Sequence, residues 1–383
     1  MRILIAPDSF KGSLPARAVA QHMENGIKKV APHSTIKLLP LADGGEGTLD
    51  CLLQAKGGYK VSVPVHDPLG RNILAQYGVL PDGTAVIEAA AAIGYHLMVN
   101  TQQDVRKANS VGVGELIKHA LEAGHTSLMI GLGGSGTNDG GVGMLHALGI
   151  RLLNAAGEEL PLVPLACQQL ERIDDTELHP QIRLANIRVV ADVTNPLCGP
   201  SGATAIYGPQ KGIAHQWINL FDQALAKFAE VVEKQFGVHV ASLPGAGAAG
   251  GLGAALVGVL GAKIYRGIEQ MLDWLDFDMH ATRADLIFTG EGKTDSQTLH
   301  GKAVFGVAQR ARRVDTPVIC ISGSIDMTAS QIDQLGVTGL LSIVPGPMSL
   351  EQAFHDAAFH VERTSQTAMQ IFLANSLSKG EKD

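Results

Sequence analysis

The sequence predicts an α/β protein whose Rossmann-like, doubly wound parallel sheet carries a second α/β domain as an insertion. Three observations predict this fold class. Short apolar runs alternate with helical patterns at the start of the chain, as in parallel strands joined by helices, and the same alternation returns after residue 280. Between these parts the pattern changes to hairpins and glycine-rich loops. The length of 383 residues also exceeds what one ordinary hydrophobic core needs.

The N-terminal part of the chain is typical of a strand, a helix and two further strands. Residues 2–6 form a short apolar run that ends at Pro7, which suits a buried strand. A helix follows, which we expect Ser13 to cap, and its apolar residues recur at spacings of three and four. Residues 35–41 and 60–65 then predict a second and a third strand.

The same pattern returns near the C-terminus. Three apolar runs predict strands at 285–289, 317–322 and 339–344, with helical patterns between them and a terminal helix after them. Together with the three N-terminal strands they would form a six-stranded sheet in the order 3-2-1-4-5-6. This domain would consist of residues 1–66 and 280–383.

Residues 67–279 would form the inserted, mixed α/β domain. An alternating stretch over 73–80 and a strand at 84–88 flank the turn 81–83, which is typical of a β-hairpin. A further strand of this domain is expected at 127–131, and its helices are expected at about 110–122, 214–236 and 251–273.

Composition argues against several classes of protein. A net charge of −7 provides no basic surface for nucleic acid. The four cysteines show no CxxC or metal-binding spacing, so we expect free thiols in a reducing cytoplasm. Pro7 and Asp8 come too early for a secretory leader, and the uncharged stretch 240–262 contains Pro244 and many glycines, which favour a loop and a buried helix over a membrane span. We therefore expect a cytoplasmic protein without nucleic-acid or membrane partners, and homo-oligomer formation stays open.

Charged loops are expected where the strand order of the first sheet reverses, because ligands of open parallel sheets bind there. PDSFKGS at 7–13 and GEGKTDSQ at 290–297 each combine an acid, a lysine and a glycine, and ADGGEGT at 42–48 adds Asp43 and Glu46. Carboxylates suit Mg²⁺, and lysines suit phosphate. Each loop alone could simply be solvated, but three on one sheet edge favour a binding site.

A glycine-rich loop, GLGGSGTNDGG at 131–141, follows the strand at 127–131 and precedes a helical run at 142–148. We expect its amides and the helix dipole to bind an anion, with Ser135 and Thr137 adding hydroxyl donors. The loop is neither a Walker A motif nor a clean GxGxxG. A tight structural turn would use the same glycines.

Other motifs of the inserted domain carry less specific signals. ADVTNPLCGPSGA at 191–203 follows an apolar strand, and its Asp192 suits a general base, a metal ligand or a helix cap. Lys211 lies between glycines in YGPQKG, and residues 244–256 are typical of a close backbone approach before a buried helix. Arg71 in DPLGR suits either binding of a carboxylate or stabilisation of its own turn.

Five motifs together resemble those of the bacterial type I glycerate kinases, and the resemblance extends from residue 1 to roughly 375. They are APDSFKGS at 6–13, LADGGEGT at 41–48, GLGGSGTNDGG at 131–141, ADVTNPLCGPSGA at 191–203 and TGEGKTDSQT at 289–298. The resemblance implies an ATP-dependent kinase that uses ATP and Mg²⁺ and transfers the γ-phosphate to a hydroxyl of the small molecule glycerate. It favours 2-phosphoglycerate over 3-phosphoglycerate as the product.

We assign roles to the charged and glycine-rich motifs as a hypothesis, with the site in a cleft between the two domains. The residues expected in catalysis are Asp192 as the base, Lys11 and Asp43. Those expected to bind nucleotide and phosphate are Gly133, Gly134, Ser135, Gly136, Thr137 and Lys293. Asp295 and Glu291 would bind the metal ion, and Arg71, or alternatively Lys11, the substrate carboxylate.

Three other functions fit part of the sequence. GLGGSGT is similar to the phosphate loop of the galactokinase–homoserine kinase group, but those kinases have no Rossmann-like half that resumes at residue 285. A nicotinamide-dependent oxidoreductase would use Asp43 to bind ribose, but the first loop lacks the glycines that it needs. A non-catalytic sensor of phosphorylated metabolites would bind ligand without turning over ATP.

Overall fold

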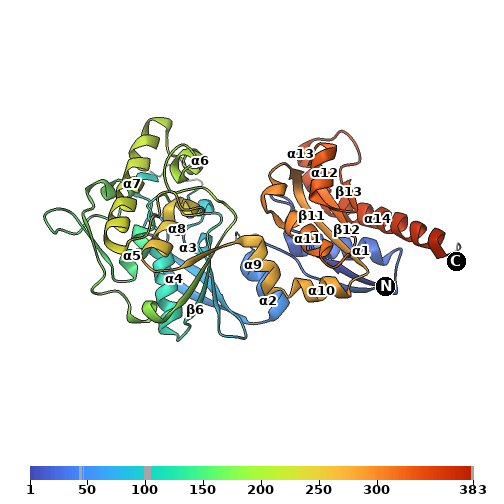
Figure 1. The fold of residues 1–383 in the computed structure, drawn as a ribbon, viewed down its shortest axis with the longest axis horizontal. Coiled ribbons are helices and arrows are strands. Elements are labelled where there is room, and N and C mark those ends of the chain that lie inside the picture. Colours follow the sequence, from blue (N-terminus) through green and yellow to red (C-terminus); the bar gives the residue numbers. More distant parts are fainter. Residues whose placement is uncertain (43–44, 46, 99–104, 381–383) are drawn as a thin grey trace. The chain divides into compact units, whose positions relative to one another are not determined.

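The computed structural model describes residues 1–42, 45, 47–98 and 105–380, with side chains up to residue 374, and the chain forms two compact units (Figure 1). The first unit comprises Met1–Asp43, Asp50–Ala55 and Gly267–Asp383. The second comprises Gly44–Leu49 and Lys56–Arg266. Each unit has its own hydrophobic core.

The first unit is built on a five-stranded sheet in the order β13-β12-β11-β1-β2. All neighbouring strands are parallel. The strands are β1 (Arg2–Ile5), β2 (Thr35–Leu38), β11 (Leu286–Asp295), β12 (Val318–Asp326) and β13 (Gly339–Ser342). Because β1 lies between β2 and β11, the strand order reverses between β1 and β11, as the sequence predicts for these five strands.

The sixth strand expected in this sheet is not there. The run at 60–65 belongs to β3 (Tyr59–His66), which pairs antiparallel with β4 (Asn72–Val79) in the second unit. Val63 and Val65 are buried and the residues between and before them are exposed, a period-two pattern that suits an antiparallel strand with one face on the core. The expected six-strand order was therefore wrong, whereas the domain boundary after residue 66 stays a prediction.

Within the described residues, eight α-helices lie wholly or mainly in the first unit. They are α1 (Ala16–Lys28), α2 (Thr48–Lys56), α9 (Gly267–Trp274), α10 (Phe277–Arg283), α11 (Ala303–Arg312), α12 (Ala329–Leu335), α13 (Leu350–His355) and α14 (Ala357–Gly380). Helices α1 and α14 pack closely, because a Cβ added at Gly26 would overlap the carbonyl oxygen of Glu362. Ser13 does not cap α1 as expected: its hydroxyl donates to the Phe354 carbonyl at 3.1 Å, and α1 begins after Pro15.

The second unit has a six-stranded mixed sheet in the order β10-β9-β6-β5-β4-β3. Its strands are β3, β4, β5 (Ala85–Glu88), β6 (Ser127–Gly131), β9 (Asn186–Ala191) and β10 (Lys263–Arg266), and β7 (Arg151–Leu153) and β8 (Arg172–Asp174) form a separate pair. The antiparallel pairing of β4 with β5 confirms the hairpin expected around residues 81–83. Strands β5, β6, β9 and β10 are parallel, so their carboxyl ends lie at one edge of the sheet.

The helices of the second unit are α3 (Ala90–Ile93), α4 (Val111–Glu122), α5 (Val142–Ala147), α6 (Ala203–Tyr207), α7 (Ile218–Phe236) and α8 (Ala248–Gly258). The single helix expected over 251–273 is divided into α8, β10 and α9. Gly261 at φ +68° provides the left-handed residue at the break. Among the residues that the structure describes, none of the helices combines the length and the apolar character that a membrane span requires.

Candidate functional site

The candidate site of the second unit lies at the carboxyl ends of two neighbouring parallel strands. The glycine-rich loop begins where β6 ends at Gly131, and Asp192 directly follows the end of β9 at Ala191. The Leu132 amide donates to the Val190 carbonyl at 3.0 Å, which continues the pairing of the two strands into the loop. Asp192 is exposed there, as a residue that meets a substrate would be. Strand pairing thus places two motifs that lie far apart in the sequence at one sheet edge.

The glycine-rich loop is fixed by backbone hydrogen bonds to the end of α3. The Gly136 amide donates to the Ile93 carbonyl at 2.7 Å, and the Tyr95 amide donates to the Gly134 carbonyl at 2.8 Å. Gly134 has a φ of +72°, which only glycine adopts without strain. The Gly136 amide is therefore already bonded to Ile93, and its role towards a phosphate stays a prediction.

Asp139 occupies the position at which the sequence predicts a bound anion. Its carboxylate accepts hydrogen bonds from the amides of Gly141 and Gly143 at 3.2 Å each, at the start of α5. It also accepts from the Ser110 amide at 2.8 Å and the Ser110 hydroxyl at 2.7 Å. Complete burial raises the pKa of Asp139, although these hydrogen bonds act in the opposite direction. The helix N-terminus expected to bind phosphate is thus occupied by the chain's own carboxylate.

Lys211 brings a cation to the glycine-rich loop from a distant part of the chain. It ends the 3₁₀ helix Pro209–Lys211, and its Nζ donates to the Ser135 hydroxyl at 3.0 Å and to the Thr137 carbonyl at 2.7 Å. The side chain is buried, and burial lowers the pKa of Lys211 to about 8, with the charge of Asp139 acting against this shift. Lys211 was not among the residues predicted for the site, and its position between two glycines was the available signal.

Among the residues that the structure describes, Thr137 Oγ1 and Asn138 Oδ1, two buried polar atoms of the loop, have no hydrogen-bond partner. The amide nitrogen of Asn138 donates to Thr204 Oγ1 at 2.9 Å, which fixes the orientation of that side chain. Buried polar groups are nearly always paired in native proteins, so an unpaired one commonly marks a place for water or a ligand. The loop therefore retains hydrogen-bonding capacity that its own fold does not use.

The segment that begins α8 packs directly on the loop. Residues 249–251 have left-handed backbone conformations, and the Gly250 carbonyl accepts from the Gly140 amide at 2.9 Å. A Cβ at Gly250 would overlap the Thr137 carbonyl oxygen and would lie 2.6 Å from Asn138 Cα. This contact confirms the close backbone approach that residues 244–256 predict.

Arg71 is engaged within its own turn. Its Nε donates to the buried carboxylate of Asp67, and its Nη2 donates to the Leu97 carbonyl at 2.9 Å. Asp67 also accepts from the amides of Leu69 and Arg71 at 2.9 Å. These contacts provide a structural role for Arg71, while its role towards a substrate carboxylate stays a prediction.

In the first unit the segment GEGKTD is strand, not the loop that the sequence predicts. Strand β11 extends to Asp295 and β12 to Asp326, and the two remain paired over this length. Gly290 and Gly323 permit the pairing, because a Cβ at either would overlap a carbonyl oxygen of the opposite strand. The loop at 7–13 lies against the same stretch, since the Asp8 amide donates to the Gly290 carbonyl at 2.8 Å. The exposed Lys11 therefore lies beside β11, whereas Asp43 lies outside the described residues.

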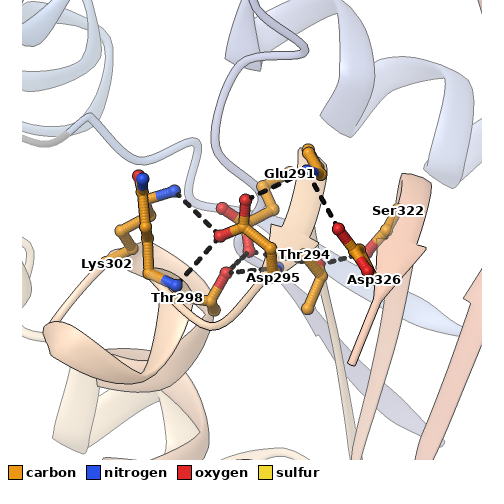
Figure 2. A network of polar contacts seen from close by, with 9 residues as sticks. Glu291, Thr294, Asp295, Thr298, Lys302, Ser322 and Asp326 are labelled. Atoms are coloured by element: carbon orange, nitrogen blue, oxygen red, sulfur yellow. Dashed lines mark hydrogen bonds and ion pairs between the residues drawn. The ribbon is translucent and has the colours of Figure 1, made fainter. Parts of the chain in front are cut away.

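Glu291 is the centre of a buried polar network (Figure 2). Its Oε1 accepts from the hydroxyls of Thr298 at 2.6 Å and Thr294 at 3.1 Å, and Thr294 also shares a 2.6 Å hydrogen bond with Ser322. Burial raises the pKa of Glu291, and the Thr298 hydroxyl and the charge of Lys302 act in the opposite direction. The hydroxyls hold the carboxylate in one orientation.

Asp295 lies between two lysines at the edge of this network. Its carboxylate is 3.4 Å from Lys293 Nζ and 3.8 Å from Lys302 Nζ, and Lys293 also contacts Asp326 at 3.3 Å. Burial acts to raise the pKa of Asp295, but the Gln297 amide and the two lysines outweigh it and lower this pKa. In the described part of the chain, no three acidic, histidine or cysteine side chains gather closely enough to hold a metal ion.

Comparison with known proteins gives one consistent result. The model of the glycerate kinase family matches residues 3–373. The glycerate kinase of Bacillus subtilis is 46% identical over 379 residues, which cover 98% of this chain and 99% of that protein. The glycerate 2-kinase of Escherichia coli is 43% identical over 367 residues, or 96% of each chain. The crystal structure of putative glycerate kinase 2 from Salmonella typhimurium superimposes with a TM-score of 0.86 at 42% identity, covering 98% of this chain and 99% of the other.

Proposed function

The chain belongs to the glycerate kinase family and is an ATP-dependent kinase, and we propose that it transfers the γ-phosphate of ATP to a hydroxyl of glycerate, mainly to give 2-phosphoglycerate. The name of the Escherichia coli relative, glycerate 2-kinase, supports position 2. The structural observation that carries the proposal is the buried Lys211 ammonium against the glycine-rich loop. Assignment to the type I group of the family is part of the proposal, and the five motifs support it.

The glycine-rich loop is proposed to bind the nucleotide phosphates. Ser135 and Thr137 provide hydroxyl donors, Gly133 and Gly134 provide amides, and Lys211 supplies positive charge close to both hydroxyl-bearing residues. Phosphate oxygens are acceptors only, so a set made of donors and one cation suits them. Because the loop is already fixed by its own hydrogen bonds, little ordering would be needed on binding.

Asp192 is proposed as the general base. In the reaction the substrate oxygen forms the new bond to phosphorus, its proton passes to the carboxylate, and ADP leaves with the electron pair of the broken bond. The exposed carboxylate directly after a parallel strand suits this role. Lys11 and Lys293 are proposed to offset negative charge on the transferring phosphate, Asp43 to assist the transfer, and Arg71 to bind the substrate carboxylate.

Glu291 and Asp295 are proposed to hold Mg²⁺, which commonly takes one or two carboxylates and completes its coordination with water and phosphate oxygens. Their hard oxygen donors fit such an ion. The positive charges of the two lysines beside Asp295 would repel a metal ion that binds without nucleotide. We therefore expect the ion to bind together with ATP. When bound, Mg²⁺ would neutralise charge that develops during phosphoryl transfer.

Two features complete the proposal. The two compact units are proposed to act as two domains, with the second inserted into the Rossmann-like first. A cytoplasmic location is proposed because all four cysteines, which lie in the described part of the chain, are free thiols.

The test is an assay that couples ADP formation to NADH oxidation, with glycerate and Mg-ATP as substrates and NMR of the phosphorylated product. We expect glycerate-dependent ADP formation and a phosphate mainly at position 2. ATP binding without glycerate-dependent turnover would instead indicate a sensor, and a phosphate mainly at position 3 would overturn the product assignment.

Asp192→Asn tests the base. We expect a fall in kcat of about 100-fold with a small change in the KM for glycerate, because proton transfer to a positioned base typically contributes this much or more. Asp175→Asn, which removes another exposed acid of the same unit, is the control and should leave kcat unchanged. A near-normal kcat in Asp192→Asn would exclude Asp192 as the base.

A further inference from the structure

The contact between Lys211 and Ser135 determines which way the serine hydroxyl can act. An ammonium group carries three N–H donors and no acceptor, whereas a hydroxyl can both accept and donate. In the 3.0 Å contact Lys211 Nζ must therefore donate, and Ser135 Oγ must accept. The hydroxyl proton of Ser135 then points elsewhere, so the side chain is presented to a ligand as a hydrogen-bond donor.

The second contact of Lys211 fixes the backbone around this hydroxyl. Nζ donates to the Thr137 carbonyl at 2.7 Å, two residues further along the loop. With two of its three N–H groups committed to one loop and its side chain only 6% exposed, Lys211 is enclosed by the residues that it contacts. This geometry suits a residue that acts through the loop better than one that reaches a ligand itself.

Buried hydroxyls on the same loop indicate that a ligand completes it. Ser135 is 8% exposed, and the fully buried Thr137 Oγ1 has no hydrogen-bond partner in the described part of the chain. An ammonium is costly to bury, and here both of its contacts are with neutral oxygens. A negatively charged ligand that accepts hydrogen bonds would add to the partial compensation of the buried charge by Asp139 and would use the hydroxyl of Thr137.

We propose that Lys211 is a positioning residue, which orients the Ser135 hydroxyl as a donor to a phosphate oxygen of the nucleotide and holds the backbone of residues 135–137 in place. This inference rests on the proposed function, because it takes the glycine-rich loop as the nucleotide site. It adds a residue that the motif does not contain, 76 positions away from the serine that it orients.

A double-mutant cycle on the full chain tests the proposal. Lys211→Met keeps a side chain of similar length and removes the ammonium, and Ser135→Ala removes the hydroxyl. We expect each to raise the KM for ATP by about tenfold, the value of one charge-assisted hydrogen bond, with little change in the KM for glycerate. Because Lys211 acts through Ser135, the double variant should be no worse than the weaker-binding single variant.

Three further measurements keep the result interpretable. Lys227→Met is the matched control, since it removes a lysine of the same unit that pairs with Glu171 and Glu230 on the surface, and it should leave both KM values unchanged. In Lys211→Ala, added ethylammonium should restore ATP affinity, but it should not do so when Ser135→Ala is also present. The melting temperature of each variant shows whether it folds.

The possible results separate the two proposals. Independent effects, in which the two fold-changes multiply, would overturn the positioning role and indicate that Lys211 contacts the ligand directly. An unchanged KM for ATP in Ser135→Ala would also overturn it, even if the Lys211 variants failed to fold. Absence of both ATP binding and kinase activity in the unmodified protein would instead refute the proposed function.

Discussion

Gly250 and Gly261 offer a matched pair of substitutions that measures the contact beneath the glycine-rich loop. Their φ values are +67° and +68°, so alanine meets the same backbone strain at both positions. Gly261 has no atom within 4 Å of an added Cβ, whereas at Gly250 the Cβ would overlap the Thr137 carbonyl oxygen. The difference between the two alanine variants therefore isolates the contact with the loop.

The expected losses follow from these two effects. A left-handed alanine costs roughly 1–2 kcal/mol, which is the whole expected effect of Gly261→Ala. At Gly250 the Cβ would lie 2.6 Å from Asn138 Cα, while ordinary contact begins at 3.4 Å, so the backbone must shift by at least 0.8 Å, and the closer Thr137 carbonyl oxygen requires more. Overpacking of this kind adds roughly 1–3 kcal/mol. Gly250→Ala should thus lose about 2–5 kcal/mol and should raise the KM for ATP, because the Thr137 carbonyl that binds Lys211 must move.

The assay is urea denaturation followed by the fluorescence of Trp217, in a Trp274→Phe background, because the two tryptophans lie in different units. Trp217 then reports on the second unit, to which both glycines belong. The free energy of unfolding is obtained by linear extrapolation. Equal losses in the two variants, or an unchanged KM for ATP in Gly250→Ala, would refute the claim that this contact shapes the loop.

Three other predictions concern stability and pH. Arg310→Met should lower the free energy of unfolding of the first unit by about 1–3 kcal/mol, and by less at high salt, because the buried guanidinium pairs with three acids that are about half exposed. Lys29→Met, which removes the more exposed ion pair of Lys29 with Glu362, should lower it by under about 1 kcal/mol in the same denaturation experiment. Gly26→Ala should lower the melting temperature, because its Cβ would separate α1 from α14, whereas Gly346→Ala, with open space around its Cβ, should leave the melting temperature unchanged. Burial lowers the pKa of Lys211 to about 8, from 10.5 for the ordinary side chain, so the ammonium is lost as the pH rises through 8 and ATP affinity should fall there. Between pH 8 and 10.5 the unfolded chain binds more protons than the folded chain, so the free energy of unfolding should rise with pH. Lys211→Met should abolish both trends in binding and denaturation measurements.

The order of five strands in the first sheet could be predicted because their apolar runs are short, local and separated by helical patterns. The third strand was misplaced because an apolar run does not say which sheet it joins. The alternation of apolar and other residues around Val63 and Val65 was visible in the sequence and favoured an antiparallel partner, and in the structure these two valines point inward. The alternation of polar and apolar residues was here a better guide than the length of the run.

The charged end of β11 shows a second limit. Glycines and charges between residues 290 and 295 are typical of a loop, and nothing local contradicts that interpretation. The strand continues because Gly290 and Gly323 let two backbones approach, and that requires a partner strand about thirty positions away. Glu291, Lys293 and Asp295 are therefore held at fixed positions along a strand, which the sequence could not indicate.

The glycine-rich loop shows why a motif can locate a site without describing it. Its pattern predicts where the backbone can turn, and the positive φ of Gly134 agrees with that. It does not predict which donors remain after the loop has folded. The Gly136 amide is bonded to Ile93, and the amides of Gly141 and Gly143 are bonded to Asp139, so the donors most often attributed to such a loop are already in use.

What remains for a ligand is set by contacts across the fold. Lys211 orients one hydroxyl of the loop, and the fully buried Thr137 hydroxyl is unpaired among the residues that the structure describes. Since the amides of Gly136, Gly141 and Gly143 stabilise the loop itself, its shape should be nearly the same with and without nucleotide, and little conformational entropy would be lost on binding. Affinity for phosphate would then depend on a few side-chain donors and one buried cation. Substitutions at Ser135 and Lys211 should therefore affect ATP binding more than substitution of Ile93, whose backbone carbonyl accepts from the Gly136 amide.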